Sequence, residues 1–142
     1  MEIKIGIGLD NIIFGMTQED IINILGSPDK MSETEISYGL VYSYNNKMIK
    51  LKFDRDEELR LTSIEVYCPG VKMFNQKIIG KTKDQIIGFL EEKHYKEPKY
   101  EEYDFFETLF YEEIWATFEF EFSKLRCIEF SPLLENDEII WP

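Results

Sequence analysis

The feature that most constrains the fold is an internal similarity between residues 13–25 and residues 78–90, which align without a gap. Both segments read apolar-apolar-Gly-x-Thr, followed by polar residues, two isoleucines and a further apolar pair. Such a similarity indicates that one structural unit is used twice, and it has to be found before single elements are assigned. We therefore predict a single domain, residues 1–142, made of two repeats that cover about residues 1–71 and 72–142.

The threonine of each segment is placed to begin a helix. The hydroxyls of Thr17 and Thr82 can accept hydrogen bonds from the free amides of a first helical turn. Asp20 and Gln85 follow three residues later, as in a capping box. Apolar residues then recur at helical spacing, namely Ile21, Ile24 and Leu25 in the first segment and Ile86, Phe89 and Leu90 in the second. Each predicted helix is therefore amphipathic and needs a sheet to cover.

After each predicted helix the period of the apolar residues changes to two, which indicates strands with one buried face. The predicted strands span residues 36–44, 49–53 and 61–69 in the first half, and 103–110, 118–122 and 125–132 in the second. This alternation places Phe118, Phe120 and Phe122 together on the buried face. The predicted fold class is α+β, with two tandem helix-plus-antiparallel-meander repeats whose helices pack on one face of the sheet or sheets.

The charge and the apolar pattern narrow the class of partner. The chain has 28 Asp and Glu residues against 16 Lys and Arg residues, a formal net charge of −12, and this excess repels the phosphate backbone of nucleic acids. The N-terminus lacks the pattern of a secretory signal, and no apolar run is long enough to span a bilayer. We therefore expect a cytoplasmic protein without a nucleic-acid or membrane partner. Cys68 and Cys127 are expected to be free thiols.

The sequence offers no set of residues typical of catalysis or metal binding. His94 is the only histidine, so a single imidazole base is available, and one histidine with two separated cysteines does not supply zinc-ligand spacing. The acidic residues 54–58 lack the central glycine and the downstream glutamate of a calcium loop. We expect no catalytic residue, no metal and no cofactor, and therefore a non-enzymatic protein.

The string IIFGMTQEDIINILGSPD at residues 12–29, with LTSIEVY at residues 61–67, resembles the repeat of the BamE/SmpA and β-lactamase-inhibitor-protein superfamily. An apolar-apolar-Gly-x-Thr opening, a Leu-Gly-x-Pro helix end and a meander of strands recur in that superfamily. The resemblance covers residues 13–69 and 78–132, although the second copy lacks the Gly-x-Pro helix end. It implies that another protein is bound across a sheet surface, as expected for small bacterial immunity proteins that look like the same scaffold.

The strongest surface signal lies in residues 101–121, which contain eight carboxylates and no Lys or Arg. Aromatic residues stand between these carboxylates, and aromatic side chains are typical anchors of protein interfaces. In the first half Lys50 and Lys52 hold the matching outward positions, so equivalent faces would carry opposite charges. Ordinary solubilising charge is the alternative explanation. The predicted partner-binding residues are Glu101, Glu102, Tyr103, Asp104, Glu107, Tyr111, Glu112, Glu113, Trp115, Glu119 and Glu121.

These observations lead to three hypotheses about function. The first is a protein-binding inhibitor, in particular an immunity protein that neutralises a basic toxin domain. The second is a non-enzymatic structural or assembly scaffold module, which includes a homodimer. The third, ranked lower, is a small-molecule-binding domain that uses the sheet face. The first hypothesis requires an acidic and aromatic sheet surface that is open to solvent.

Overall fold

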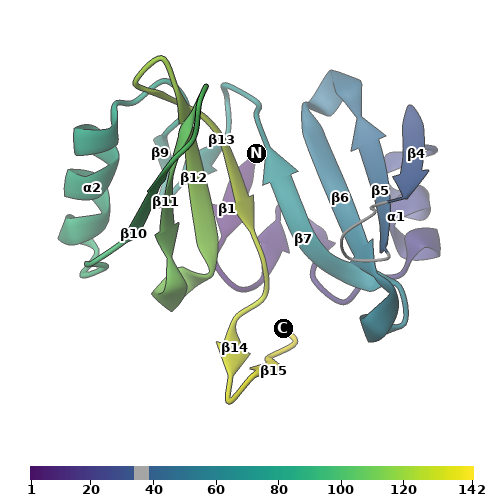
Figure 1. Cartoon of the computed structure of the whole chain (residues 1–142). Coiled ribbons are helices and arrows are strands. Elements are labelled where there is room, and N and C mark those ends of the chain that lie inside the picture. The colour runs from purple at the N-terminus through teal and green to yellow at the C-terminus, as the bar shows by residue number, and fades with distance from the viewer. Residues whose placement is uncertain (34–38) are drawn as a thin grey trace.

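The computed structural model describes residues 1–33 and 39–142 (Figure 1). It is dominated by an eight-stranded antiparallel sheet in the order β10-β11-β12-β13-β7-β6-β5-β4. One half of this sheet comes from β4 (Lys30–Glu33), β5 (Gly39–Tyr44), β6 (Ile49–Asp54) and β7 (Arg60–Val66). The other half comes from β10 (Lys99–Glu102), β11 (Glu107–Tyr111), β12 (Ala116–Glu121) and β13 (Lys124–Phe130).

A second sheet of short strands has the order β3-β2-β1-β8-β9 and lies behind the centre of the large sheet in Figure 1. Its strands are β1 (Glu2–Lys4), β2 (Gly8–Leu9), β3 (Ile12–Ile13), β8 (Lys72–Met73) and β9 (Gln76–Lys77). β1 and β8 pair in parallel, with Ile3 opposite Met73. Near the C-terminus, β14 (Leu134–Glu135) and β15 (Glu138–Ile139) form a separate hairpin. The large sheet and this small sheet therefore each combine strands from the two halves of the chain.

The helices α1 (Gln18–Leu25) and α2 (Lys83–Glu92) begin at the predicted threonines, and both predicted capping boxes are confirmed. The Thr17 hydroxyl accepts from the amide of Asp20 at 3.2 Å, and the Thr82 hydroxyl accepts from the amide of Gln85 at 3.3 Å. Three short 3-10 turns, η1 (Asn45–Lys47), η2 (Arg55–Glu57) and η3 (Glu112–Ile114), connect neighbouring strands. In the part of the chain that the structure describes, none of the helices has the length and apolar character needed to cross a membrane.

The two helices bury different amounts of their predicted apolar faces. α2 buries Ile86, Phe89 and Leu90, as its periodicity predicts. α1 fully buries only Ile21, whereas Ile24 is 38% exposed. The prediction for Ile24 is therefore wrong, and α1 covers the sheet with a narrower face than its sequence indicates.

A single hydrophobic core fills the space between the large sheet, the helices and the small sheet. The alternating residues Leu51, Phe118 and Phe120 lie on the inner face of the large sheet and are fully buried. Phe14, which follows β3, packs edge-on against Phe130 of β13, with ring centroids 5.5 Å apart. Since a fully buried side chain of this size contributes about 1.5–3 kcal/mol, this inner face is the main source of stability.

The predicted fold class is wrong. The chain is mostly β rather than α+β, and its two helices have only 8 and 10 residues. The strands do not form two helix-plus-meander repeats, because β7 and β13 pair with each other and merge all eight strands into one sheet. The parallel pairing of β1 with β8 adds a second sheet that the prediction lacked. The repeat boundary near residues 71–72 stays a prediction.

Two strand predictions need separate correction. The predicted strand 103–110 is a turn followed by β11, while the edge strand β10 lies just before it. Phe122 was expected on the buried face with Phe118 and Phe120, but β12 ends at Glu121 and Phe122 is 93% exposed in the following turn. Residues 36–38 of the first predicted strand lie outside the described residues.

A polar network on the outer face holds the two halves of the large sheet together. Glu65 of β7 lies opposite Glu129 of β13, which brings two carboxylates into register. Lys52 Nζ of β6 is 2.8 Å from Glu129 Oε2 and 3.8 Å from Glu65 Oε2. Ser63 Oγ donates to the same Glu129 oxygen at 2.8 Å. Burial lowers the pKa of Lys52, but the hydrogen bond to Glu129 and the charges of Glu129 and Glu65 outweigh it, so the pKa is raised overall.

We expect the substitution Lys52→Gln to lower the free energy of unfolding by about 1 kcal/mol, because it leaves two facing carboxylates without their cation. Chemical denaturation at pH 7 measures this difference, with Lys52→Arg as a control that keeps the charge. Because the folded-state pKa of Lys52 is raised, the contribution is fully present below its unfolded pKa and is lost as the pH rises through the folded pKa. Equal stability of the Gln and Arg variants would contradict the prediction.

Candidate protein-binding surface

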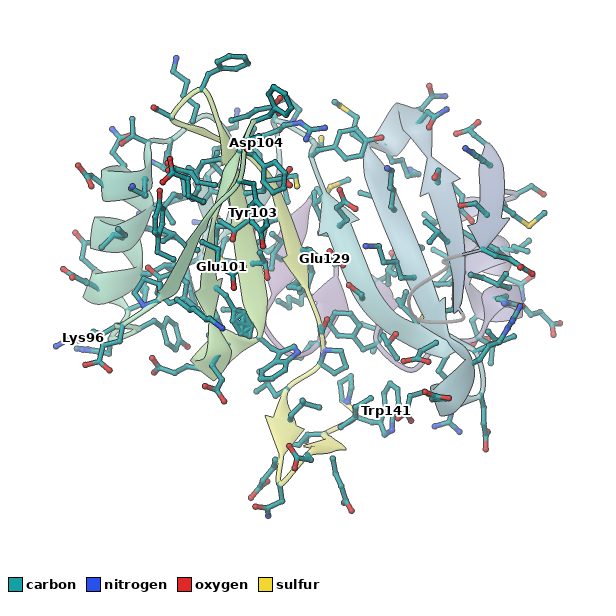
Figure 2. The ribbon with its side chains drawn as sticks, in the orientation of Figure 1. Lys96, Glu101, Tyr103, Asp104, Glu129 and Trp141 are labelled. Carbon is teal, nitrogen blue, oxygen red and sulfur yellow. The ribbon has the colours of Figure 1, made fainter. Side chains whose placement is uncertain are left out.

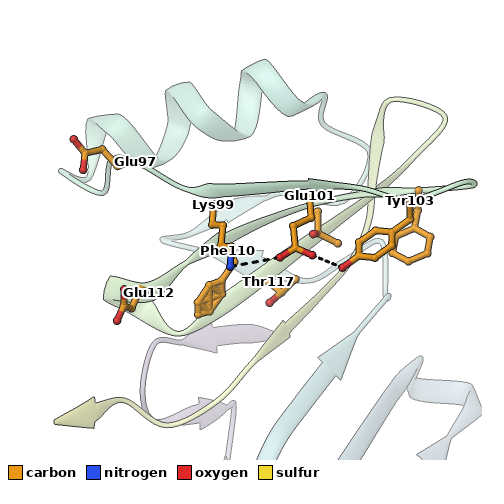
Figure 3. Close-up of a pocket in the computed structure, with 9 residues that line it drawn as sticks. Glu97, Lys99, Glu101, Tyr103, Phe110, Glu112 and Thr117 are labelled. Carbon is orange, nitrogen blue, oxygen red and sulfur yellow. Dashed lines mark hydrogen bonds and ion pairs between the residues drawn. The ribbon is translucent and has the colours of Figure 1, made fainter. Parts of the chain in front are cut away.

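The outer face of β10, β11 and β12 is hollowed by a cleft of about 680 Å³, shown in Figure 3 and called the outer cleft below. The strand register places Lys99, Phe110 and Thr117 in one row across the three strands. Glu101 and Thr108 form the next row. Because side chains two residues apart on a strand point to the same face, both rows face the same cleft. Its full lining is Glu97, Lys99, Glu101, Tyr103, Phe106, Thr108, Phe110, Glu112 and Thr117.

Glu101 is the central charged group of the outer cleft. Tyr103 donates its hydroxyl to Glu101 Oε2 at 2.5 Å, and Lys99 Nζ lies 3.7 Å from Glu101 Oε1 (Figure 3). The hydrogen bond to Glu101 raises the pKa of Tyr103, with burial and the charge of Glu101 acting in the same direction. The lining contains three carboxylates and one lysine. The cleft is therefore negatively charged and suits a cationic group.

Aromatic rings form the two ends of the outer cleft. At one end Tyr103 and Phe106 stack with ring centroids 4.6 Å apart. At the other end Phe110 meets Trp115 edge-on, with centroids 5.3 Å apart. Tyr103 is 47% exposed and Phe106 is 36% exposed. The cleft thus offers apolar ring surface that is still in contact with water, beside carboxylates that are ready to pair.

The structure brings one group of the predicted residues together. Glu101, Glu102, Tyr103 and Asp104 follow one another along β10 and its turn, and all four are exposed; Figure 2 labels Glu101, Tyr103 and Asp104. Glu112 lines the outer cleft. Its neighbour Glu113 is also exposed, and this side chain accepts from the amide of Lys96 at 3.4 Å. Glu101 and Glu112 therefore line the outer cleft, whereas Glu102 lines a second hollow beside the β10–β11 turn.

Two predicted aromatic anchors are placed differently. Tyr111 is only 1% exposed and packs against Phe118 in the core, so the prediction that it contacts a partner is wrong. The register explains this, because Tyr111 pairs with Ala116 on the inner face while its neighbour Phe110 points outward. Burial, with a smaller effect of the Glu91 charge, raises the pKa of Tyr111 to about 12. Trp115 is half-buried against Phe110.

The remaining predicted carboxylates are neutralised by cations from neighbouring elements. Glu119 and Glu121 both pair with Arg126 of β13, at 3.0 and 2.9 Å. Glu107 faces the inner side and pairs with Lys83 of α2 at 3.7 Å. The expectation that residues 101–121 carry an uncompensated charge is therefore too simple. The segment contains no cation of its own, but the adjacent strand and helix supply them.

The outer face next to these carboxylates also holds a buried thiol. Cys127 Sγ lies 3.4 Å from Glu119 Oε2 and 3.8 Å from Glu65 Oε1. Burial, followed by the charges of these two carboxylates, raises the pKa of the Cys127 thiol. Both Cys127 and Cys68 are free, as predicted. The Cys127 thiol therefore stays protonated and is a poor nucleophile.

Sequence reasoning missed the most exposed aromatic residues of this region. Phe105 in the β10–β11 turn is 84% exposed, and Phe122 in the β12–β13 turn is 93% exposed. A second, smaller hollow of about 230 Å³ lies between the two turns and is lined by Phe106, Phe122 and Ser123 among others. We call Phe105, Phe122 and the two turns that carry them the aromatic tip. Reading residues 122 and 123 as a turn between two strands would have revealed Phe122 as exposed.

Comparison with known proteins gives a likeness of fold but no family. No protein-family model matches the chain, and no curated protein sequence does so. A similar solved structure is the crystal structure of an extracellular protein containing a SCP domain from Bacillus anthracis str. Ames, with a TM-score of 0.54 and 13% sequence identity. The match covers 86% of this chain and 44% of that chain. The present chain therefore spans less than half of that protein, and the likeness concerns the fold alone.

We expect Tyr100, on the inner side of β10, to titrate with a pKa of about 12. The main cause is the hydrogen bond that its hydroxyl donates to Glu107 Oε2 at 2.7 Å, and burial and nearby carboxylate charges add to it. NMR of the tyrosine Cζ resonances between pH 9 and 12.5 measures this pKa, with Tyr100→Phe as the assignment control. Glu107→Gln is expected to lower it toward the ordinary value of 10.0. An unchanged pKa in that variant would contradict the proposed cause.

Proposed function

We propose that this chain is a non-enzymatic inhibitor that binds a basic protein across the outer cleft, as an immunity protein that neutralises a basic toxin domain would. The observation that carries the proposal is the outer cleft itself. There the half-exposed ring of Tyr103 and the ring of Phe106 lie beside Glu101, within a lining of three carboxylates and one lysine.

Two physical arguments support this reading. Aromatic rings contribute most to interface energy when they move from water into a packed contact, and the rings of the outer cleft have surface left to bury. The net charge of −12 and the carboxylates of β10 attract a cationic surface over a distance comparable to the Debye length. Charge then steers the encounter, and the rings hold the complex.

The resemblance of the capped helix openings to the BamE/SmpA and β-lactamase-inhibitor-protein superfamily agrees with the same proposal. The resemblance implies that this chain binds another protein across the surface of its sheet. The proposal includes that the chain belongs to this superfamily and that it binds its partner in the cytoplasm. The carboxylates of Glu101 and Glu112 that line the outer cleft then face the basic surface of the toxin domain.

We expect the double substitution Glu101→Lys and Glu112→Lys, at two carboxylates that line the outer cleft, to weaken binding of the natural partner by about tenfold or more. The partner is first captured on the tagged wild-type chain from the native host and identified by mass spectrometry, and its affinity is then measured by surface plasmon resonance. The association rate of the wild-type chain should fall as salt rises. If the partner is a toxin, co-expression of the wild-type chain should protect cells and the double variant should not.

The matched control is Glu135→Lys with Glu138→Lys, which changes the net charge equally at two exposed strand positions of the β14–β15 hairpin. Affinity lost equally in both double variants would mean that only overall charge matters. Unchanged affinity in the Glu101 and Glu112 variant would remove the outer cleft from the proposal. Light scattering separates the scaffold alternative, because a stable self-associated species would favour a homodimer.

A further inference from the structure

The turn between β12 and β13 carries a residue that this kind of turn disfavours. In the described ranges, three hairpins have two-residue turns in which both residues have positive φ: Phe74–Asn75, Phe122–Ser123 and Asn136–Asp137. Such turns favour Asn, Asp and Gly, because other side chains are strained at positive φ. Phe122 has φ of 52°. Its backbone is therefore held in a conformation that a phenylalanine adopts at a cost.

The other two turns contain either a residue type that tolerates positive φ or a ring whose packing offsets the strain. Asn136 and Asp137 are of the favoured types. Phe74 is disfavoured by its φ of 49°, but its ring lies against Phe89 and Tyr95, with centroids 6.1 and 6.3 Å away, and it packs on the core. Phe122 is 93% exposed and does not belong to that core. The strain at Phe74 is offset by packing, whereas the fold gains no comparable packing from the ring of Phe122.

Phe122 does not stand alone at this end of the molecule. The β10–β11 turn beside it presents Phe105, which is 84% exposed. The two turns are neighbours, since residues from both line the hollow of about 230 Å³ between them. Glu102 and Glu107 line the same hollow, and Asp104 sits next to Phe105 in the turn. Two exposed rings therefore project beside Glu102 and Asp104, whereas Glu107 is already paired with Lys83 of α2.

We propose that Phe105 and Phe122 act as a paired aromatic anchor that enters an apolar depression rimmed by Lys or Arg side chains on the partner. This inference rests on the proposed function and extends the contact from the outer cleft to the aromatic tip. The charge of the tip determines which partner surface fits. When the rings become buried, the nearby carboxylates lose water as well, so the partner has to supply cations beside its apolar depression. A second copy of this chain would bring the same carboxylates against each other.

The first test measures stability and needs no partner. In Phe122→Asn the turn receives a residue that tolerates positive φ, so the melting temperature should stay equal or rise by about 2–4 °C. The matched control, Phe74→Asn, should lower the melting temperature because it removes a packed ring. A clear drop for Phe122→Asn would overturn the inference, since it would show that the ring serves the fold.

The second test uses a defined probe, β-cyclodextrin with amino groups on its rim, which presents an apolar cavity surrounded by cations. In NMR titrations the ring signals of Phe105 and Phe122 should shift. The apparent affinity should exceed that of carboxylate-rimmed cyclodextrin by about tenfold at low salt. The double variant Phe105→Ser with Phe122→Asn should lose the response. The inference would be overturned if the wild type bound both cyclodextrins equally well. It would also be overturned if the wild type and the double variant bound the amino cyclodextrin equally well.

The third test separates this inference from the proposed function. With the partner captured as described above, Phe122→Asn should weaken binding by about tenfold, as expected for a central aromatic anchor. If Glu101→Lys with Glu112→Lys weakens binding and Phe122→Asn leaves it unchanged, the aromatic tip is overturned while the outer cleft stands. If both sets of variants bind as the wild type does, the proposed function fails together with the anchor.

Discussion

The antiparallel pairing of β7 with β13 is the interaction on which the rest of the structure depends. It joins four strands from each half of the chain into one sheet, so that a single apolar face can cover a single core. The same pairing sets Glu65 against Glu129 on the outer face, and Lys52 compensates the two charges. One strand register thus fixes both which residues form the core on the inner face and which charged residues meet on the outer face.

The features that could be predicted from the sequence are those that depend on residues close together in the chain. The capping boxes at Thr17 and Thr82 and the buried face of α2 depend on contacts within a few residues, and their signals are strong. The fold class failed because it depends on which strands meet. No residue pattern announces that β1 pairs in parallel with β8. The edge strand β10 escaped detection because all of its residues are exposed, which removes the alternation that reveals a strand.

The candidate site was predicted in part for the same reason. The exposed run around Glu101 and Tyr103 was found from composition, since acidic and aromatic residues gather there in the sequence. The charge balance of residues 101–121 was not found, because Arg126 on the adjacent strand compensates Glu119. Parity along β11 decided that Tyr111 points inward, and one missed turn hid Phe122. Each of these three predictions differed from the structure because it depends on contacts between strands, which the composition of a segment does not reveal.

The two edges of the large sheet have a consequence for behaviour at high concentration. β10 and β4 both leave backbone amides and carbonyls facing outward, and such edges can recruit further strands into fibrils. Here β10 presents Lys99, Glu101 and Glu102, and β4 presents Lys30 and Glu33. Charges along an open edge have to be desolvated before another strand can add. We therefore expect these charges to oppose the addition of a ninth strand, and with it growth into fibrils, although the molecule is mostly β.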